Sequence, residues 1–106
     1  MNALLLAIDV GTTATKCLLL DPARGAVAEY ERPVALASAR PGWAEEDPDA
    51  WWANVRELTA EAVAGAGERP IAAVGVTGMV PALVCLDAAG RPLRAAILQN
   101  DARADR

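Results

Sequence analysis

Two short apolar runs separated by a polar turn constrain this chain more than any other feature. Residues 3–8 and 17–20 are continuous apolar segments, and Asp9 to Lys16 lie between them as Asp-Val-Gly-Thr-Thr-Ala-Thr-Lys. Short apolar runs bounded by turn residues are typical of buried strands. We therefore predict a β-hairpin, with strands at about 3–9 and 15–21 and a turn rich in hydroxyl groups.

The residue types in this turn suit the binding of phosphate. Gly11 permits a positive φ or the close approach of another group, and the hydroxyl and N–H groups of Thr12 and Thr13 can be directed at an anion. Asp9 is a hard oxygen ligand suited to Mg²⁺, and Lys16, the only lysine, offers a compact positive charge. Hydroxyl-rich Asp-x-Gly-Thr turns also close hairpins that bind nothing, and that alternative stays open here. Neither a P-loop nor a Gly-x-Gly-x-x-Gly motif is present.

Length and composition limit the remaining possibilities. The 106 residues form one domain at most, with 54% hydrophobic residues and a net charge of −4. An acidic chain without clustered Lys and Arg is not expected to bind nucleic acid or an anionic membrane. The absence of His removes histidine bases and ligands. The first apolar run is too short to span a membrane and lacks a basic leader, which predicts a cytoplasmic protein.

The two cysteines indicate no special chemistry. Cys17 and Cys85 are far apart and belong to no Cys-x-x-Cys pair, so we predict neither a zinc site nor a disulfide framework. Both are expected to be small buried hydrophobic residues.

A β-α-β unit is predicted to follow the hairpin. Residues 26–32 read as a third, peripheral strand with mixed faces, and residues 33–47 as a loop. Asp47 is a good N-cap for a helix that we expect to run to about Ala64 and to end at Gly65 and Gly67. Its Trp51 and Trp52 are predicted to pack in the core rather than to stack on a ligand.

The apolar segment 71–78 does not alternate, which predicts a parallel strand buried on both faces. Further strands are expected at 80–86 and 93–98, joined by a turn at 87–90. The chain ends in Gln-Asn-Asp-Ala-Arg-Ala-Asp-Arg, which we interpret as the beginning of another element.

Three stretches, taken together, resemble the N-terminus of the FGGY carbohydrate kinases, the group that includes xylulokinases and glycerol kinases. They are the Asp9–Lys16 turn, the Gly42–Pro48 stretch with its two following tryptophans, and the 73–78 strand, which leads through 86–93 to the 99–103 segment. The resemblance spans nearly the whole chain. It implies an α/β, actin-like/ribonuclease H-like ATPase domain, of which this chain is an incomplete part with a mixed sheet and a β-β-β-α-β start.

The resemblance also assigns roles to residues of the turn. It places Asp9 near magnesium and the transferring phosphate. Thr12 and Thr13, together with Gly11, are placed at the phosphates of ATP. Lys16, where some relatives carry Arg, would act as a phosphate counter-charge, which keeps the attraction but loses bidentate geometry. ATP and Mg²⁺ are therefore the implied cofactors.

The implied sugar pocket departs from the family pattern. The loop after Thr77 is polar in glycerol kinases and reads Gln-Met-His-Gly in typical xylulokinases, but here Gly78 and Met79 are followed by Val-Pro. The second wall, formed by Asn100, Asp101 and Arg103, resembles the xylulokinase Trp-Asn-Asp-Gly-Arg stretch with Gln in place of Trp. These residues are candidate sugar contacts, with solvated strand ends as the alternative, and the particular sugar or polyol is left open.

The implied reaction transfers the γ-phosphate of ATP to a hydroxyl of a sugar or polyol. In this family the aspartate base and the second, adenosine-binding domain lie beyond position 106, so no catalytic residue is expected here and the chain alone is expected to be inactive. The resemblance leaves open a homodimer formed through the missing parts. Two other hypotheses remain: a non-catalytic actin-like nucleotide-binding sensor or activator, and a structural relic that binds nothing.

Overall fold

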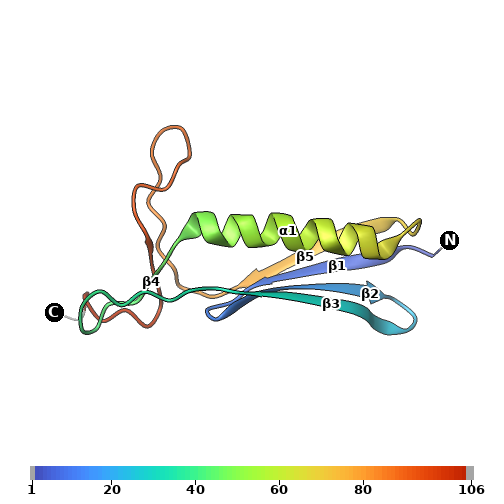
Figure 1. The fold of residues 1–106 in the computed structure, drawn as a ribbon, viewed down its shortest axis with the longest axis horizontal. Coiled ribbons are helices and arrows are strands. Elements are labelled where there is room, and N and C mark those ends of the chain that lie inside the picture. Colours follow the sequence, from blue (N-terminus) through green and yellow to red (C-terminus); the bar gives the residue numbers. More distant parts are fainter. Residues whose placement is uncertain (1, 105–106) are drawn as a thin grey trace.

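A mixed sheet with one long helix along one of its faces forms the body of the molecule (Figure 1). The computed structural model describes residues 2–104. Their elements are, in order, β1 (Leu4–Val10), β2 (Ala14–Asp21), β3 (Gly25–Pro33), β4 (Glu45–Glu46), α1 (Pro48–Ala66), β5 (Ile71–Gly78) and β6 (Ala96–Ile97). The main sheet has the order β3-β2-β1-β5, and β4 pairs with β6 separately. The predicted β-β-β-α-β start and mixed sheet are confirmed.

The first two strands form the predicted hairpin, and the helix is a crossover. β1 and β2 are antiparallel, with Ile8 opposite Cys17 and Asp9 opposite Lys16. β5 runs parallel to β1, which requires a connection that returns the chain to the same end of the sheet, and α1 provides it. β3 lies at the edge of the sheet, as its mixed faces predicted.

The core lies between α1 and the first two strands. Every second side chain of β1 and β2 points toward the helix because side chains alternate along a strand. The helix meets them with small and branched residues at the spacing of one face. The buried cluster consists of Leu4, Leu6, Ile8, Cys17, Leu19, Leu58, Ala62 and Ala66.

Capping residues set both ends of α1. The Asp47 side chain accepts a hydrogen bond from Asp49 N at 2.9 Å, which confirms the predicted N-cap. The helix continues past the predicted end and stops at Gly67, whose φ is 62°. Gly65 is part of the helix and does not end it. Glycine is needed at this position because a Cβ there would overlap the Tyr30 hydroxyl.

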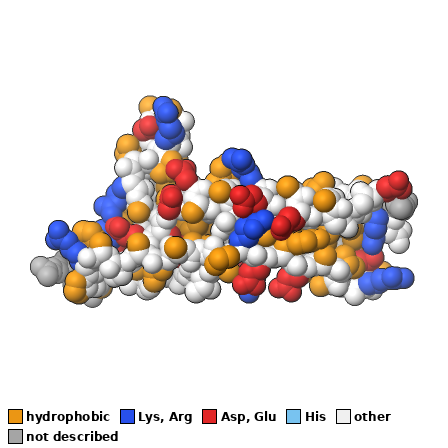
Figure 2. Space-filling view, viewed as in Figure 1, with side chains coloured by type: hydrophobic (Ala, Val, Ile, Leu, Met, Phe, Trp, Pro, Cys, Tyr) orange, Lys and Arg blue, Asp and Glu red, His pale blue; other side chains and the backbone are white. Residues whose placement is uncertain are grey.

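Ion pairs fasten the exposed side of α1 to the edge strand. Arg32 on β3 lies 3.1 Å from a Glu57 carboxylate oxygen and 2.9 Å from one of Glu61. Figure 2 shows acidic and basic side chains interspersed on the face in view. None of the described helices is long and apolar enough to cross a membrane.

The segment after β5 differs most from the prediction. The expected strand at 80–86 is absent, and residues 79–95 instead form an arm that projects from the body (Figure 1). Two isolated bridges, Leu83 with Ile97 and Leu86 with Pro92, hold the arm together. Pro81 and Pro92 cannot donate ladder hydrogen bonds, which shortens any pairing there. The predicted last strand is reduced to β6, which pairs with β4 in a region predicted to be a loop.

Three burial predictions are wrong. Val74 and Val76 on β5 are 57% and 70% exposed, because β5 is an edge strand and α1 packs over β1, β2 and β3. Cys85 is exposed because it lies on the projecting arm, whereas Cys17 is buried as expected. Trp52 is 60% exposed.

Candidate functional site

The turn between β1 and β2 is tight at Gly11. The Gly11 N–H donates to Ala14 O at 3.0 Å, and a Cβ on Gly11 would lie 2.9 Å from the same oxygen. Of the two roles considered for this glycine, the structure shows the close approach, because Gly11 is not among the glycines with positive φ. The turn therefore keeps its shape only with glycine at this position.

Two opposite charges stand side by side where the turn begins and ends. Asp9 and Lys16 are register partners across β1 and β2, so their side chains lie on the same face, opposite to α1. Both line an open cavity of about 180 Å³. Within residues 2–104 neither forms an ion pair. Both groups are therefore available to a ligand.

The two threonines of the turn present free backbone donors. Thr12 is half-buried and Thr13 is exposed. Thr13 O accepts a hydrogen bond from Val34 N at 2.9 Å, which fixes the turn against the segment after β3. Within the described residues the amides of both threonines donate no backbone hydrogen bond. Successive free N–H groups of this kind form a concave anion-binding surface.

The single carboxylate at the turn, that of Asp9, fits one common mode of Mg²⁺ binding. The described residues contain no group of three or more acidic, Cys or His side chains that could hold a metal by themselves. Mg²⁺ typically keeps several waters and is bound by one or two carboxylates together with substrate phosphates. A single carboxylate at Asp9, beside a phosphate-binding turn, fits that mode of binding.

The end of β5 adjoins the turn. The Met79 N–H donates to Val10 O at 3.0 Å, and a Cβ on Gly78 would lie 3.1 Å from that oxygen. A second cavity, of about 350 Å³, is lined by these two residues together with Val10 and Trp51. The structure thus brings the predicted sugar loop next to the predicted phosphate turn.

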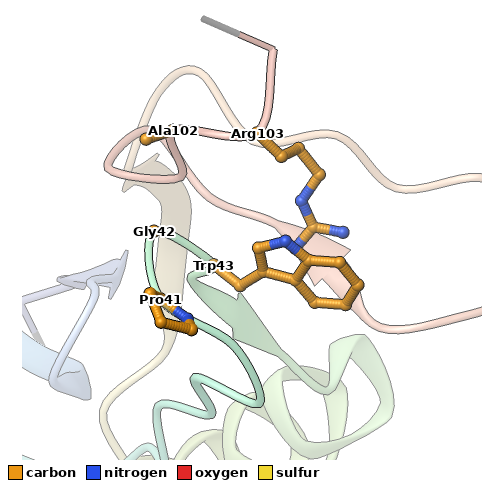
Figure 3. Close-up of a pocket in the computed structure, with 5 residues that line it drawn as sticks. All are labelled: Pro41, Gly42, Trp43, Ala102 and Arg103. Atoms are coloured by element: carbon orange, nitrogen blue, oxygen red, sulfur yellow. The ribbon is translucent and has the colours of Figure 1, made fainter.

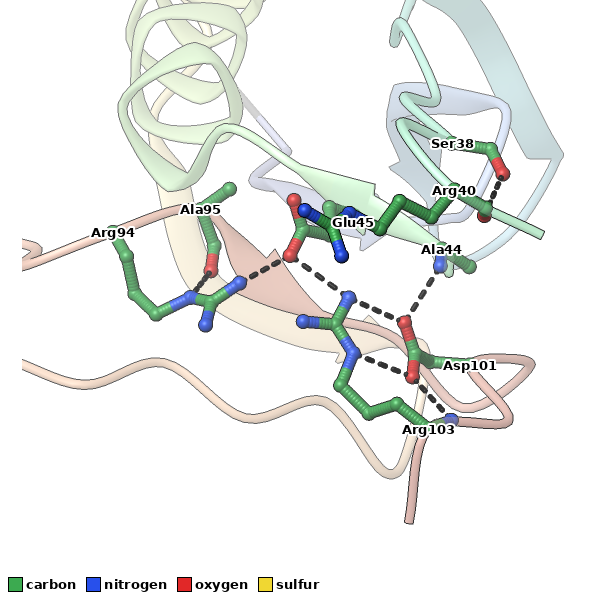
Figure 4. A network of polar contacts seen from close by, with 8 residues as sticks. All are labelled: Ser38, Arg40, Ala44, Glu45, Arg94, Ala95, Asp101 and Arg103. Atoms are coloured by element: carbon green, nitrogen blue, oxygen red, sulfur yellow. Dashed lines mark hydrogen bonds and ion pairs between the residues drawn. The ribbon is translucent and has the colours of Figure 1, made fainter. Parts of the chain in front are cut away.

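The second predicted wall of the sugar pocket is formed by Asn100, Asp101 and Arg103. Two of these residues, Asp101 and Arg103, belong to an ion-pair network (Figure 4). Arg103 donates to the two Asp101 carboxylate oxygens at 2.8 and 2.6 Å and to Glu45 Oε2 at 2.8 Å. Asp101 also accepts from Ala44 N at 2.7 Å, and Arg94 pairs with Glu45. The hydrogen bond from Arg103 holds the pKa of Asp101 well below its usual range. These groups join the C-terminal segment to β4.

Arg103 also stacks on an aromatic ring. Its guanidinium lies 4.0 Å from the centroid of the Trp43 ring, and Arg40 lies 5.1 Å from it. Figure 3 shows Trp43 and Arg103 at the side of an open cavity of about 280 Å³. Asn100 is exposed. Of the three residues predicted for this wall, Asp101 and Arg103 thus have their polar groups engaged within the chain.

One residue at the cavity beside Asp9 was not predicted from the sequence. Thr77 on β5 is the register partner of Asp9 and lines the same cavity. The available signal was the prediction that 71–78 is a parallel strand, but neither its partner strand nor the register can be read from a single sequence.

The fold and turn together define the opening part of an actin-like, ribonuclease H-like ATPase domain. Residues 4–106 match the N-terminal domain of the FGGY family of carbohydrate kinases. The chain belongs to this family.

Known relatives cover this chain almost completely. A glycerol kinase from Methylorubrum extorquens (strain PA1) is 38% identical over 94% of the chain and 21% of its own length. A xylulose kinase from Escherichia coli (strain K12) is 33% identical over 92% of the chain and 20% of its own length. The crystal structure of xylulose kinase from Rhodospirillum rubrum superposes with a TM-score of 0.89 at 46% identity, over 94% of this chain and 21% of that one. The chain thus spans about a fifth of the length of these relatives.

Proposed function

We propose that this chain is the N-terminal part of the first domain of an ATP-dependent, xylulokinase-like carbohydrate kinase, which transfers the γ-phosphate of ATP to a hydroxyl of a sugar or polyol. One observation carries the proposal. The Asp9–Lys16 pair and the free amides of Thr12 and Thr13 lie on one turn, and Met79 is hydrogen-bonded to the strand that ends there. A phosphate donor and a hydroxyl acceptor bound at these places would be neighbours.

The residues of the turn contribute positioning and charge. Lys16 offers a positive charge to phosphate oxygens, and the amides of Thr12 and Thr13 donate hydrogen bonds to them. Asp9 would hold Mg²⁺, which when bound neutralises negative charge on the transferring phosphates. Each of these groups stabilises charge, and none has to form a covalent bond.

The acceptor would bind beside Gly78 and Met79. The cavity there is lined mostly by apolar residues, together with Trp51 and Thr77, so that hydrogen bonds to sugar hydroxyls must come from few groups. Asn100, Asp101 and Arg103 remain candidates for such bonds. Because the Gln-Met-His-Gly polar set is missing, the proposal stops at the class of sugars and polyols.

The rest of the reaction needs groups outside residues 1–106. The aspartate that takes the proton from the attacking hydroxyl and the adenosine-binding domain would belong to a larger protein, as the five-fold greater length of the relatives suggests. By itself the chain should therefore show little or no turnover in an ADP-release assay with ketoses and polyols.

Binding of Mg·ATP to the ¹⁵N-labelled chain tests the proposal. We expect amide shifts at residues 11–16, and Asp9→Asn and Lys16→Met should each weaken binding by about tenfold, which corresponds to about 1.4 kcal/mol. Asp87→Asn is the matched control, because it keeps the turn chemistry of the arm and lies outside both cavities. Binding that is unaffected by both changes at the turn would contradict the proposal.

A further inference from the structure

Thr77 contributes to the lining of two cavities. The cavity beside the phosphate turn is lined by Asp9, Lys16 and Thr77 among others, and the cavity beside the predicted sugar loop by Trp51, Met79 and again Thr77. Thr77 is the residue that these two linings share. Asp9, Lys16 and Thr77 project on the face of the sheet opposite to α1, whereas Trp51 belongs to α1, so the Thr77 hydroxyl faces the first of these cavities.

Thr77 completes a row of side chains across three strands. Asp9 on β1 has Lys16 as its register partner on β2 and Thr77 as its partner on β5. Partners in register project on the same face of a sheet, with neighbouring strands about 4.8 Å apart. Asp9 therefore has a cation on one side and a hydroxyl on the other.

The hydroxyl of Thr77 is free to bind a ligand. The residue is exposed, and its side chain has no hydrogen-bond partner within residues 2–104. A phosphate group above Asp9 is repelled by that carboxylate unless donors or cations surround it. Lys16 supplies such a group from β2, and on the β5 side the position is taken by Thr77.

We propose that Thr77 Oγ1 donates a hydrogen bond to a phosphate oxygen held above Asp9 and Lys16. The inference rests on the proposed function and adds to it one residue that binds the transferring group. A neutral hydroxyl suits this place because it donates to an anionic oxygen without adding charge next to the acceptor.

The alternative is that Thr77 is only a good strand residue. β-branched residues are favoured in strands whether or not they bind anything. Thr77→Val separates the two roles, because it keeps the branched shape and the strand preference and removes only the hydroxyl. Thr77→Ser keeps the hydroxyl and loses the methyl group.

The test measures the affinity of magnesium tripolyphosphate for the 106-residue chain by calorimetric titration. Thr77→Val should weaken binding by about tenfold, as expected for one hydrogen bond to a charged group, and Thr77→Ser should keep most of the affinity. Thr59→Val is the matched control, because that hydroxyl lies on α1 against Cys17 on the opposite face of the sheet. Thermal unfolding of each variant checks that the fold is intact, and Thr77→Ala gives a second variant without the hydroxyl.

The outcomes distinguish this inference from the function on which it rests. If Asp9→Asn weakens binding and both Thr77→Val and Thr77→Ala bind like the wild type, the role of Thr77 is refuted and the phosphate turn stands. If the wild type does not bind magnesium tripolyphosphate, or if Asp9→Asn has no effect, the phosphate turn itself is refuted and the role of Thr77 with it.

Discussion

Glu46 is expected to make this chain less stable as pH rises above 4.5. This residue is 1% exposed and lies on β4, two positions after the buried Ala44. Glu46 Oε1 accepts a hydrogen bond from Trp51 Nε1 at 2.8 Å, but Oε2 has no partner within the described residues. Burial raises the pKa of this carboxyl above 4.5, and the bond from Trp51 offsets part of that effect.

The direction of the pH dependence follows from this shift. Between 4.5 and the raised pKa, the folded state binds a proton at Glu46 that the unfolded state has already released. The free energy of unfolding therefore falls as pH rises through that window, and it stays at the lower value above it. Below pH 4.5 the carboxyl is neutral in both states and contributes no dependence.

Glu46→Gln should accordingly stabilise the protein at neutral pH. The amide keeps an oxygen for Trp51 and removes the buried charge. Its NH₂ group still lacks a partner, so the gain is a part of the cost of an unsatisfied buried polar group, which is typically about 1 to 3 kcal/mol and more for a charged one. For a domain of this size, each kcal/mol raises Tm by about 4 to 8 °C. Thermal unfolding of both proteins between pH 3.5 and 8 should show a gain that grows with pH and levels off.

Two neighbouring variants sharpen this experiment. Glu45→Gln should lower Tm at neutral pH, because that carboxylate pairs with Arg94 and Arg103. Glu68→Gln, at an exposed position after α1, should leave Tm unchanged. Equal Tm values for Glu46→Gln and the wild type at pH 8, or identical pH profiles, would refute the reasoning about Glu46.

Three further predictions concern the turn, the network and the core. Gly11→Ala should destabilise the fold by about 1 to 3 kcal/mol and weaken magnesium tripolyphosphate binding, since its Cβ would press on Ala14 O; denaturant unfolding and calorimetry measure both. Asp101→Asn should lower Tm at pH 7 and reduce the loss of stability that the wild type shows as pH falls below 3.8, because the lowered pKa of Asp101 depends on Arg103. Leu58→Ala, at a fully buried position, should cost about 2 to 5 kcal/mol in urea unfolding.

Local patterns were sufficient to predict the hairpin and the helix. The apolar runs around the Asp9–Lys16 turn and the Asp47 cap each act within a few residues, so they can be recognised in a single sequence. The Asp9–Lys16 turn, on which the proposed phosphate site rests, could be predicted for the same reason. Its residues are neighbours along the chain, and their chemistry does not depend on distant contacts.

Features that depend on distant pairing could not be predicted in this way. Glu45 and Glu46 read as an acidic loop, because charged residues normally face water. In the fold, β4 pairs with β6, which buries one carboxylate and gives the other two arginine partners. The place of Thr77 beside Asp9 likewise follows from the register of two strands that are far apart in sequence.

The uncovered edge of β5 has a practical consequence for handling this chain. Its backbone groups on the side away from β1 have no partner strand in the sheet, and Val74 and Val76 leave its surface apolar. Such an edge is a template onto which another polypeptide can add a strand. Concentrated samples should therefore associate edge to edge, and a lysine at position 74 or 76 should keep them dispersed without disturbing the hairpin.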